Sequence, residues 1–290
     1  MNAKIKITVA IIDTGISPAR LENPIMLPGI NLSGKGEVDD TTDSGKHGTL
    51  VAKTILSIAP ATRIVPIRLM DRWGNLHDRT QVEEAFAWIL ENCEALGINI
   101  VCATFADCSH ATSDAEHRGS RLQQQIAALR ERNVLTVAPA GNWYQRFRGQ
   151  SPQGMAWPAI IREVISVGEV EQHEGGLRLT TRTQRLHASL GTGCQTTIFA
   201  MSGELGNTSG ATAVVIGYMA ALIQASSPIT PVQIVSILQQ SQQMAYDDCR
   251  FSWPSINFFE DRKDLLLHQE TLQSQLPLQV QLPLPQPIVY

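Results

Sequence analysis

The stretch "AIIDTG", residues 10–15, ends a run of apolar residues on a carboxylate, Asp13. The apolar run reads as a strand buried on both faces, and Asp13 falls where that strand would end. An acid in this position has four interpretations: a turn residue, half of an aspartic-protease dyad, the acid of a phosphate-binding loop, or the orienting member of a catalytic triad. The rest of the chain has to distinguish among them.

Apolar runs and helical patterns alternate along most of the chain. Buried strands are predicted at residues 7–12, 64–69, 98–105, 134–138 and 164–167, and helices at residues 48–58, 80–96, 120–132, 209–225 and 231–243. This alternation indicates an α/β fold whose mainly parallel, twisted sheet is covered on both faces, a three-layer α/β/α sandwich. Ligand sites in such sheets lie beyond the carboxyl ends of the strands. Asp13 and Asn142 both fall in that position.

The composition argues against two classes of partner. The chain has 290 residues, of which 43% are hydrophobic, and a formal net charge of −4. Its lysines and arginines are scattered, so no basic patch is expected to bind nucleic acid or an anionic membrane surface. No apolar stretch approaches the length of a membrane span. We expect neither nucleic acid nor a membrane as a partner.

The cysteines and the N-terminus predict a cytoplasmic location. Five cysteines, without a C-x-x-C pair, suggest neither a disulfide framework nor a zinc site. Reduced, mostly buried thiols are expected instead. The first residues run directly into a predicted strand, without the apolar region or the cleavage site of a secretory signal. The cysteines are Cys93, Cys102, Cys108, Cys194 and Cys249.

The C-terminal segment differs in composition from the rest. We expect one domain over residues 1–268 and a Pro/Gln/Leu-rich tail over residues 269–290. The tail contains "QSQLPLQVQLPLPQPIVY", an uncharged stretch whose prolines prevent a helix. An extended tail of this kind is a candidate for binding in cis, along a substrate groove, or for binding a partner.

Three further stretches place polar residues at the ends of predicted elements. "DSGKHGTLVAKTIL" puts His47 at the start of a helix, "VLTVAPAGN" ends a strand on Asn142, and "GELGNTSGATAVVIGYMAAL" puts Ser209 in a first helical turn. Taken singly, each has an ordinary structural interpretation, such as a turn asparagine or a helix cap. A serine at a helix start is also well placed as a nucleophile, because free backbone N–H groups and the helix dipole stabilise an oxyanion there.

Together these stretches resemble the subtilisin-like serine peptidases, whose catalytic residues follow the order Asp, His, Ser. The resemblance is carried by "IIDTGI", "HGTLVAKTI", "APAGN" and "NTSGATA". Weaker similarity is found in "SIAPATRIVPIRLMDRWG", "AWPAIIREVISVGEV" and "WPSINFFED", so the resemblance extends over residues 5–267.

The resemblance implies a role for each matching residue. Ser209 would be the nucleophile, His47 the general base, and Asp13 the acid that orients the imidazole. Asn142 and the Ser209 backbone N–H would bind the oxyanion, with the asparagine contributing about 3 to 4 kcal/mol. Substrate-binding residues are implied on two segments, Thr104, Phe105 and Ala106 on one, and Ala138, Pro139, Ala140 and Gly141 on the other. The ligand would be a peptide or protein substrate, and no metal or cofactor is expected.

The chain departs from the family pattern near the serine and in the helix that His47 begins. Asn207 and Ala213 replace a glycine and a proline that are usual around the nucleophile, and asparagine tolerates positive φ. Leu50 and Lys53 stand where histidine and glycine are common. There is no room for the family's frequent calcium loop, so we expect no calcium at that position and a solvated acidic loop at Asp39, Asp40 and Asp43.

Only twelve residues precede Asp13, too few for the propeptide that secreted members carry. We therefore expect an intracellular protease restrained by narrow specificity, for instance in the maturation of a precursor peptide.

Three alternatives remain to be weighed. An aspartic protease would need a second Asp-Thr-Gly and a polar residue instead of Ile16. An ATPase would need a phosphate loop, and "SGKHG" lacks its glycine-rich lead-in. The strongest rival is a weakly active or inactive subtilase scaffold that binds peptides, and it is motivated by Asn207 and Ala213.

Overall fold

The computed structural model describes residues 6–149, 151–174, 176–225, 233–236, 242–246 and 252–256. Its strands join in one mixed sheet in the order β2-β4-β1-β5-β6-β7-β8-β10-β11-β9, with β3 also paired to β4. The strands are β1 (Thr8–Asp13), β2 (Ile25–Met26), β3 (Ile30–Asn31), β4 (Arg63–Arg68), β5 (Ile98–Ala103), β6 (Leu135–Pro139), β7 (Ile165–His173), β8 (Gly176–Leu179), β9 (Ile198–Met201), β10 (Gln242–Tyr246) and β11 (Ser252–Ile256).

The half of the sheet from β2 to β7 is parallel throughout. β1 lies at its centre, between β4 and β5, and all six of its residues are buried. Its side chains alternate between the two faces, and Ala10 and Ile12 belong to the main core cluster. The continuous apolar runs of the sequence are therefore strands with both faces covered, as predicted.

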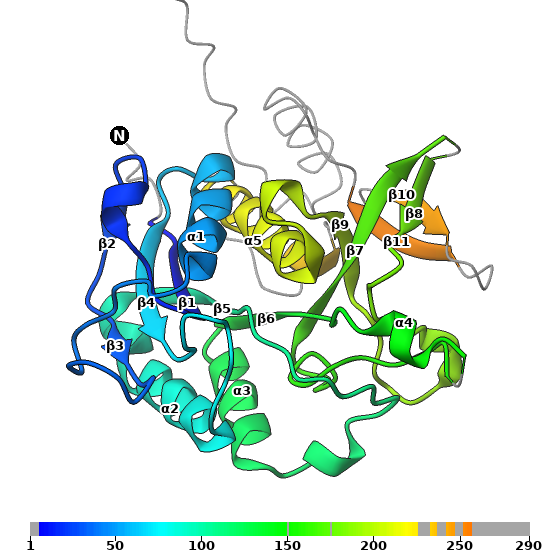
Figure 1. Cartoon of the computed structure of the whole chain (residues 1–290), viewed down its shortest axis with the longest axis horizontal. Coiled ribbons are helices and arrows are strands. Elements are labelled where there is room, and N and C mark those ends of the chain that lie inside the picture. Colours follow the sequence, from blue (N-terminus) through cyan, green and yellow to red (C-terminus); the bar gives the residue numbers. More distant parts are fainter. Residues whose placement is uncertain are drawn as a thin grey trace, which may run out of the picture. The chain divides into compact units, whose positions relative to one another are not determined.

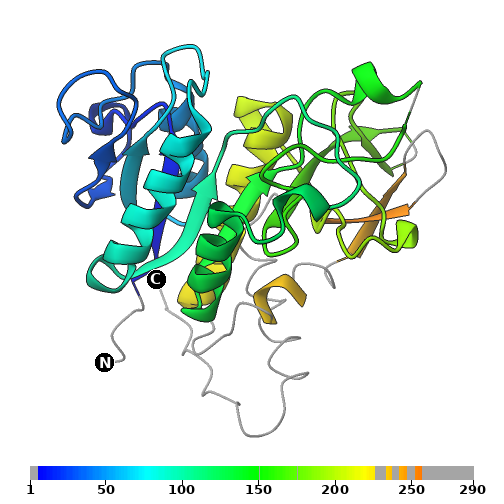
Figure 2. The ribbon, with the colours of Figure 1, turned by 90° about the horizontal axis from the view of Figure 1, so that it is seen from below.

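Helices cover the two faces of this parallel half (Figure 1). α1 (His47–Ile58) and α5 (Asn207–Ala225) lie on one face, and α2 (Arg79–Leu96) and α3 (Arg121–Glu131) lie on the other. Figure 2 shows α2 and α3 side by side across their face. Short helices follow in the connections: α4 (Tyr144–Phe147) and the 3-10 turns η1 (Pro18–Arg20), η2 (Ala115–His117), η3 (Ala188–Leu190) and η4 (Gly203–Leu205). The arrangement has the predicted three layers.

Local signals explain where α2 and α3 begin and end. The Asp78 side chain accepts a hydrogen bond from the Thr80 N–H, and the Ser120 side chain accepts one from the Gln123 N–H. Both are N-cap bonds, which satisfy N–H groups that have no partner within the helix. α2 ends at Gly97, whose φ of 62° suits a left-handed C-terminal residue.

In the other half of the sheet only the start of β7 was predicted from the sequence, and the short strands β2 and β3 of the parallel half were not predicted either. β7 and β8 form a hairpin, β10 and β11 are antiparallel, and β9 pairs in parallel with both β7 and β11. With the β8–β10 pairing, these strands close a ring that includes β7. The predicted helix over residues 231–243 is wrong at its end, because Gln242 and Gln243 belong to β10.

α5 is the most buried helix that the structure describes. It is apolar on nearly all sides and contacts α1 and four strands of the sheet, β5, β6, β7 and β9. By length and composition it is apolar enough to cross a membrane, contrary to the expectation that no segment reaches that length, but 72% of its most apolar window is buried in the protein. We interpret it as a core helix. The predicted tail, residues 269–290, lies outside the described residues.

Candidate active site

Asp13 ends β1 and is fully buried. One carboxylate oxygen, Oδ1, accepts a 2.7 Å hydrogen bond from the Thr14 N–H, and the other accepts one from the Thr104 hydroxyl. Thr104 follows β5, the neighbour of β1, so the sheet itself brings the two residues together. The carboxylate meets the imidazole of His47, with Nδ1 at 2.9 Å from Oδ1 and 2.8 Å from Oδ2. Asp13 is thus held in place by donors on three sides.

His47 is the first residue of α1, and the glycine after it allows the close approach to Asp13. A Cβ on Gly48 would lie 2.2 Å from the Gly15 carbonyl oxygen and 3.0 Å from the Asp13 Cβ. Any larger residue would push the start of α1 away from β1. Because Nδ1 is bonded to Asp13, the Nε2 atom is the one left to act on another group.

Asp43 organises the loop that leads into α1. Its carboxylate accepts five hydrogen bonds, from the hydroxyls of Thr14 and Thr49 and from the N–H groups of Gly45, Lys46 and Thr49. Burial raises the pKa of Asp43, but the hydrogen bonds outweigh it and the net shift is downward. Asp43 is therefore part of the site's framework, whereas the sequence analysis placed it in a solvated acidic loop.

Two opposing effects set the pKa of His47. Burial lowers the pKa of the imidazole, but the charge of Asp13, its hydrogen bond and the charge of Asp43 outweigh that effect. The net result is a pKa above the usual value for histidine. This environment stabilises the imidazolium, as a general base that takes up a proton requires.

Ser209 lies in the first turn of α5 and opens onto the same pocket as His47. The pocket has a volume of about 310 Å³, and Asn142 is also part of its lining. The three residues come from three elements that are far apart in the sequence. Through the bond between His47 and Asp13, the structure brings Asp13 together with His47, Ser209 and Asn142; Asp13 and Asn142 lie at the carboxyl ends of strands, where the sequence placed them.

The side chain of Asn142 has a defined orientation. Its Oδ1 atom accepts hydrogen bonds from the Thr208 N–H at 3.0 Å and from the Thr208 hydroxyl at 2.9 Å. Since two donors fix the carbonyl end, the NH₂ end is left as the donor for a ligand. Thr208 was not singled out in the sequence, although its place directly before the candidate nucleophile is the signal that marks it.

Comparison with known proteins agrees with this geometry. The sequence profile of the subtilase family, Peptidase S8, matches residues 4–267. The chain belongs to the subtilase family. Members of this family are serine endopeptidases, and the chain is one of them.

Solved structures support the fold of this subtilase. Sphericase is 19% identical with a TM-score of 0.66, and the match covers 82% of this chain and 83% of that one. A cold adapted subtilisin-like serine proteinase is also 19% identical with a TM-score of 0.66, covering 88% of this chain and 89% of that one. None of the curated proteins compared with the chain matches it. At this identity the two structures confirm the three-layer α/β fold.

The turn before Ser209 accommodates the departure at position 207. Asn207 has a φ of 58°, a left-handed conformation that asparagine adopts more readily than most residues. Its side-chain oxygen accepts a 3.1 Å hydrogen bond from Arg182. Ala213 is fully buried within α5. At the other departures, Leu50 is partly exposed and Lys53 forms an exposed ion pair with Glu204 at 3.3 Å.

The two segments expected to bind substrate differ in how they meet the pocket. Thr104, Phe105 and Ala106 all line it, and Thr104 also holds Asp13. On the other segment Pro139 lines the pocket, while Ala138 and Ala140 belong to the main core cluster and Gly141 is buried.

Several lining residues were not proposed from the sequence. Met70, Arg72 and Trp73 follow β4, the other neighbour of β1, and Trp143 follows Asn142. Trp73 is 72% exposed, and the Arg72 guanidinium stacks on its ring at 4.3 Å. Ligand sites lie beyond the carboxyl ends of parallel strands, and β4 is one of these strands. The residues that follow β4 could therefore have been predicted as pocket residues.

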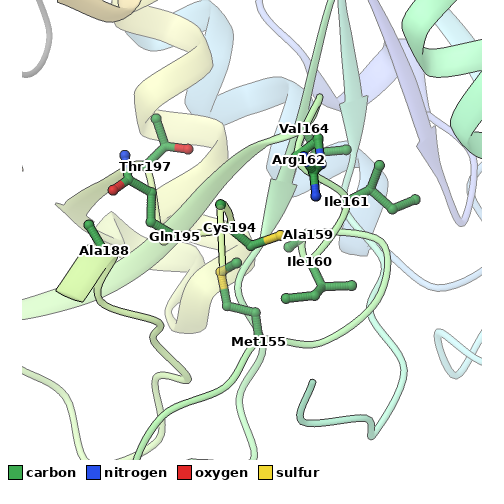
Figure 3. Close-up of a pocket in the computed structure, with 11 residues that line it drawn as sticks. Met155, Ala159, Ile160, Ile161, Arg162, Val164, Ala188, Cys194, Gln195 and Thr197 are labelled. Atoms are coloured by element: carbon green, nitrogen blue, oxygen red, sulfur yellow. The ribbon is translucent and has the colours of Figure 1, made fainter. Parts of the chain in front are cut away.

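A second cavity, of about 330 Å³, contains none of these residues (Figure 3). Met155, Ile160 and Cys194 are among the residues that line it. Its arginine, Arg162, is held by Asp114 through bonds of 2.5 and 2.7 Å. Burial raises the pKa of the Cys194 thiol. The cavity therefore offers no activated nucleophile.

Two of the three aspartates in the predicted acidic loop, Asp40 and Asp43, have side-chain partners in the protein. Asp40 pairs with Arg68 at 2.9 Å, and Asp43 is bonded as described above. Within the part of the chain that the structure describes, no three His, Cys, Asp or Glu side chains are grouped so as to hold a metal ion.

Proposed function

We propose that this subtilase hydrolyses peptide bonds with Ser209 as nucleophile, His47 as general base and Asp13 as the orienting acid. The observation that carries the proposal is the shared pocket. The imidazole bonded to Asp13, the amide of Asn142 oriented by Thr208, and Ser209 all contribute to one pocket of about 310 Å³.

The proposed reaction has two stages. The Ser209 Oγ attacks the scissile carbonyl carbon while its proton passes to His47 Nε2, and the carbonyl oxygen becomes an oxyanion bound by Asn142 and the Ser209 N–H. His47 then protonates the leaving amine, so that the C–N bond breaks and an acyl-enzyme remains. A water molecule, deprotonated by His47, releases the acid and restores Ser209. Asp13 keeps its charge throughout and stabilises the imidazolium.

We further propose that the protease acts in the cytoplasm on a restricted set of peptides, such as a precursor that it matures. The free thiols of Cys93, Cys102, Cys108 and Cys194 are in keeping with a reducing compartment. The rim formed by Met70, Arg72 and Trp73 adds side chains that can discriminate between substrates. The tail beyond residue 268 is a second candidate restraint, through binding in cis or to a partner.

Hydrolysis of a peptide library by the full chain tests the activity. Wild type should cleave peptides, and Ser209→Ala should lower kcat by about 10⁶-fold. Ser189→Ala is the control, because the Ser189 hydroxyl lies 2.8 Å from Nδ1 of a histidine, His187, but Ser189 is not part of the pocket lining. Equal activity in wild type and Ser209→Ala would contradict the proposal.

Binding without cleavage is the outcome that favours the rival function. If wild type binds library peptides but leaves them intact, the chain is a peptide-binding module on a subtilase fold. Cleavage confined to a few related sequences supports restricted specificity, and cleavage of most of the library contradicts it.

A further inference from the structure

We propose that Gln184 is a positioning residue that holds Asn142 in place for oxyanion binding. The inference rests on the proposed function and adds to it a residue outside the four catalytic positions. Gln184 is fully buried, and its hydrogen bonds join the loop that carries Asn142 to the segment that follows the pocket-lining residues Phe105 and Ala106.

On one side, Gln184 binds both chain neighbours of Asn142. The Gln184 N–H donates to the Gly141 carbonyl at 2.9 Å, and the Trp143 N–H donates to Gln184 Oε1 at 3.4 Å. Gly141 has a φ of 113°, and a Cβ there would lie 2.1 Å from Gln184 Oε1. The glutamine therefore packs directly against the loop backbone on either side of Asn142.

On the other side, the amide of Gln184 binds the segment that follows β5. Its Nε2 donates to the Ser109 carbonyl at 2.8 Å and to His110 Nδ1 at 2.8 Å. His110 is itself fixed, since its Nε2 lies 2.9 Å from the Ser151 carbonyl and its ring stacks on Phe147. Both hydrogens of the Gln184 amide are used, so its orientation is determined by its partners.

These bonds assign Gln184 a task that Thr208 does not perform. Thr208 fixes the rotation of the Asn142 amide, and Gln184 ties the backbone on either side of Asn142 to Ser109 and His110. An oxyanion donor acts through its exact distance to a charge that exists only in the transition state. Loss of Gln184 should therefore lower kcat and leave KM nearly unchanged.

Gln184→Met is the main test, because methionine has a similar length but cannot make the three side-chain hydrogen bonds, while the backbone bond to Gly141 is kept. We expect kcat to fall by about 10- to 100-fold, as for a small displacement of a catalytic group, with KM changed by less than about 3-fold. Gln125→Met is the matched control: Gln125 is also a buried glutamine, but it binds the Glu83 carbonyl, away from the pocket. The control should lower thermal stability without changing kcat.

A double-mutant cycle separates positioning from a general structural role. With Asn142→Ala as the background, adding Gln184→Met should change kcat by less than about 3-fold, because the donor that Gln184 positions is already gone. If Gln184→Met lowered kcat by the same factor in wild type and in Asn142→Ala, the inference would be overturned. An unchanged kcat in the Gln184→Met single variant would overturn it as well.

A second variant guards against misfolding. Gln184→Glu keeps the size of the side chain and an acceptor for Trp143, but it cannot donate to Ser109 or His110. Its kcat should also fall relative to wild type. That fall should be smaller when the substitution is made in the Asn142→Ala background. A full-activity Gln184→Glu overturns the inference. If the wild-type chain cleaves no peptide, the proposed function is contradicted. If wild type is active and Gln184→Met is equally active, only the role of Gln184 is contradicted.

Discussion

At the scale of single residues, the candidate site depends on a buried carboxylate, that of Asp13, and on the hydrogen-bond donors around it. Asp13 is fully buried, and a carboxylate in that position is stable only when donors surround it. Thr14, Thr104 and His47 supply them. Asp13 and His47 could be proposed from the sequence, because each lies in a recognisable motif. It could not reveal Thr104 as a partner of Asp13, since that bond depends on the pairing of β1 with β5.

The pH dependence of acylation should report the pKa of His47. Because Asp13 and Asp43 raise that pKa, the rate should rise with pH through an inflection above about 6.5, the ordinary value for histidine. Single-turnover acylation measured across this range checks it. Asp13→Asn should lower both the inflection and, by about 10⁴-fold, the rate. An inflection below 6.5, or a rate that rises toward acid pH, contradicts His47 as the base.

The hydroxyl of Thr208 should contribute to kcat through Asn142. Thr208→Val removes the 2.9 Å bond to Asn142 but keeps the bond from the backbone N–H. The loss of one net hydrogen bond should lower kcat by about 10-fold. Thr212→Val is the control, because Thr212 is also buried in α5 but binds the Thr208 carbonyl. Equal kcat values in wild type and Thr208→Val would exclude this role.

At the scale of elements, the parallel half was predictable and the mixed half was not. β1, β4, β5 and β6 are largely apolar because helices cover both faces, whereas the two-residue strands β2 and β3 carry no such signal. β8 has four residues and one apolar face, and β10 begins with two glutamines. The pairings of β8, β9, β10 and β11 join distant segments, so their strand character depends on tertiary partners.

The start of α5 depends on the left-handed conformation of Asn207. Asn207→Val should lower the free energy of unfolding by about 1 to 2 kcal/mol, because a β-branched residue is strained at positive φ. Asn207→Gly should keep the turn and most of the activity. Arg182→Ala separates the effects, since it removes the hydrogen bond to Asn207 and leaves φ unchanged. Chemical denaturation and kcat check all three, and a Val variant as stable as wild type would refute the strain argument.

At the scale of the whole molecule, the fold places the proposed catalytic side chains at one end of the sheet and a buried aspartate with two arginine partners elsewhere. Asp114 is fully buried between Arg162, at 2.5 and 2.7 Å, and Arg118, at 3.3 Å. Hydrogen bonds from Arg162 hold the pKa of Asp114 well below its usual value. The sequence contained no signal for this pair, because its members are distant along the chain and lie in irregular segments.

Acid should weaken the fold through Asp114. Since the pKa of Asp114 in the folded state is below the ordinary value of about 3.9, its contribution to stability is complete above that value and is lost progressively as the pH falls from there through the lower folded-state pKa. Asp114→Asn should lower the free energy of unfolding at neutral pH by about 1.5 to 3 kcal/mol and reduce its acid dependence. Glu171→Gln, which breaks the exposed pair with Arg178, should have little effect. If the free energy of unfolding fell equally with pH in wild type and in Asp114→Asn, Asp114 would not be the source of the acid dependence.

The most direct test of the central claim is the intact mass of the folded chain after exposure to a fluorophosphonate. If Asp13, His47, Ser209 and Asn142 form one working site, wild type gains a single adduct, which peptide mapping places on Ser209. Ser209→Ala should gain none, and Ser189→Ala should react like wild type. A folded wild-type chain without an adduct, or an adduct on another serine, would contradict the account.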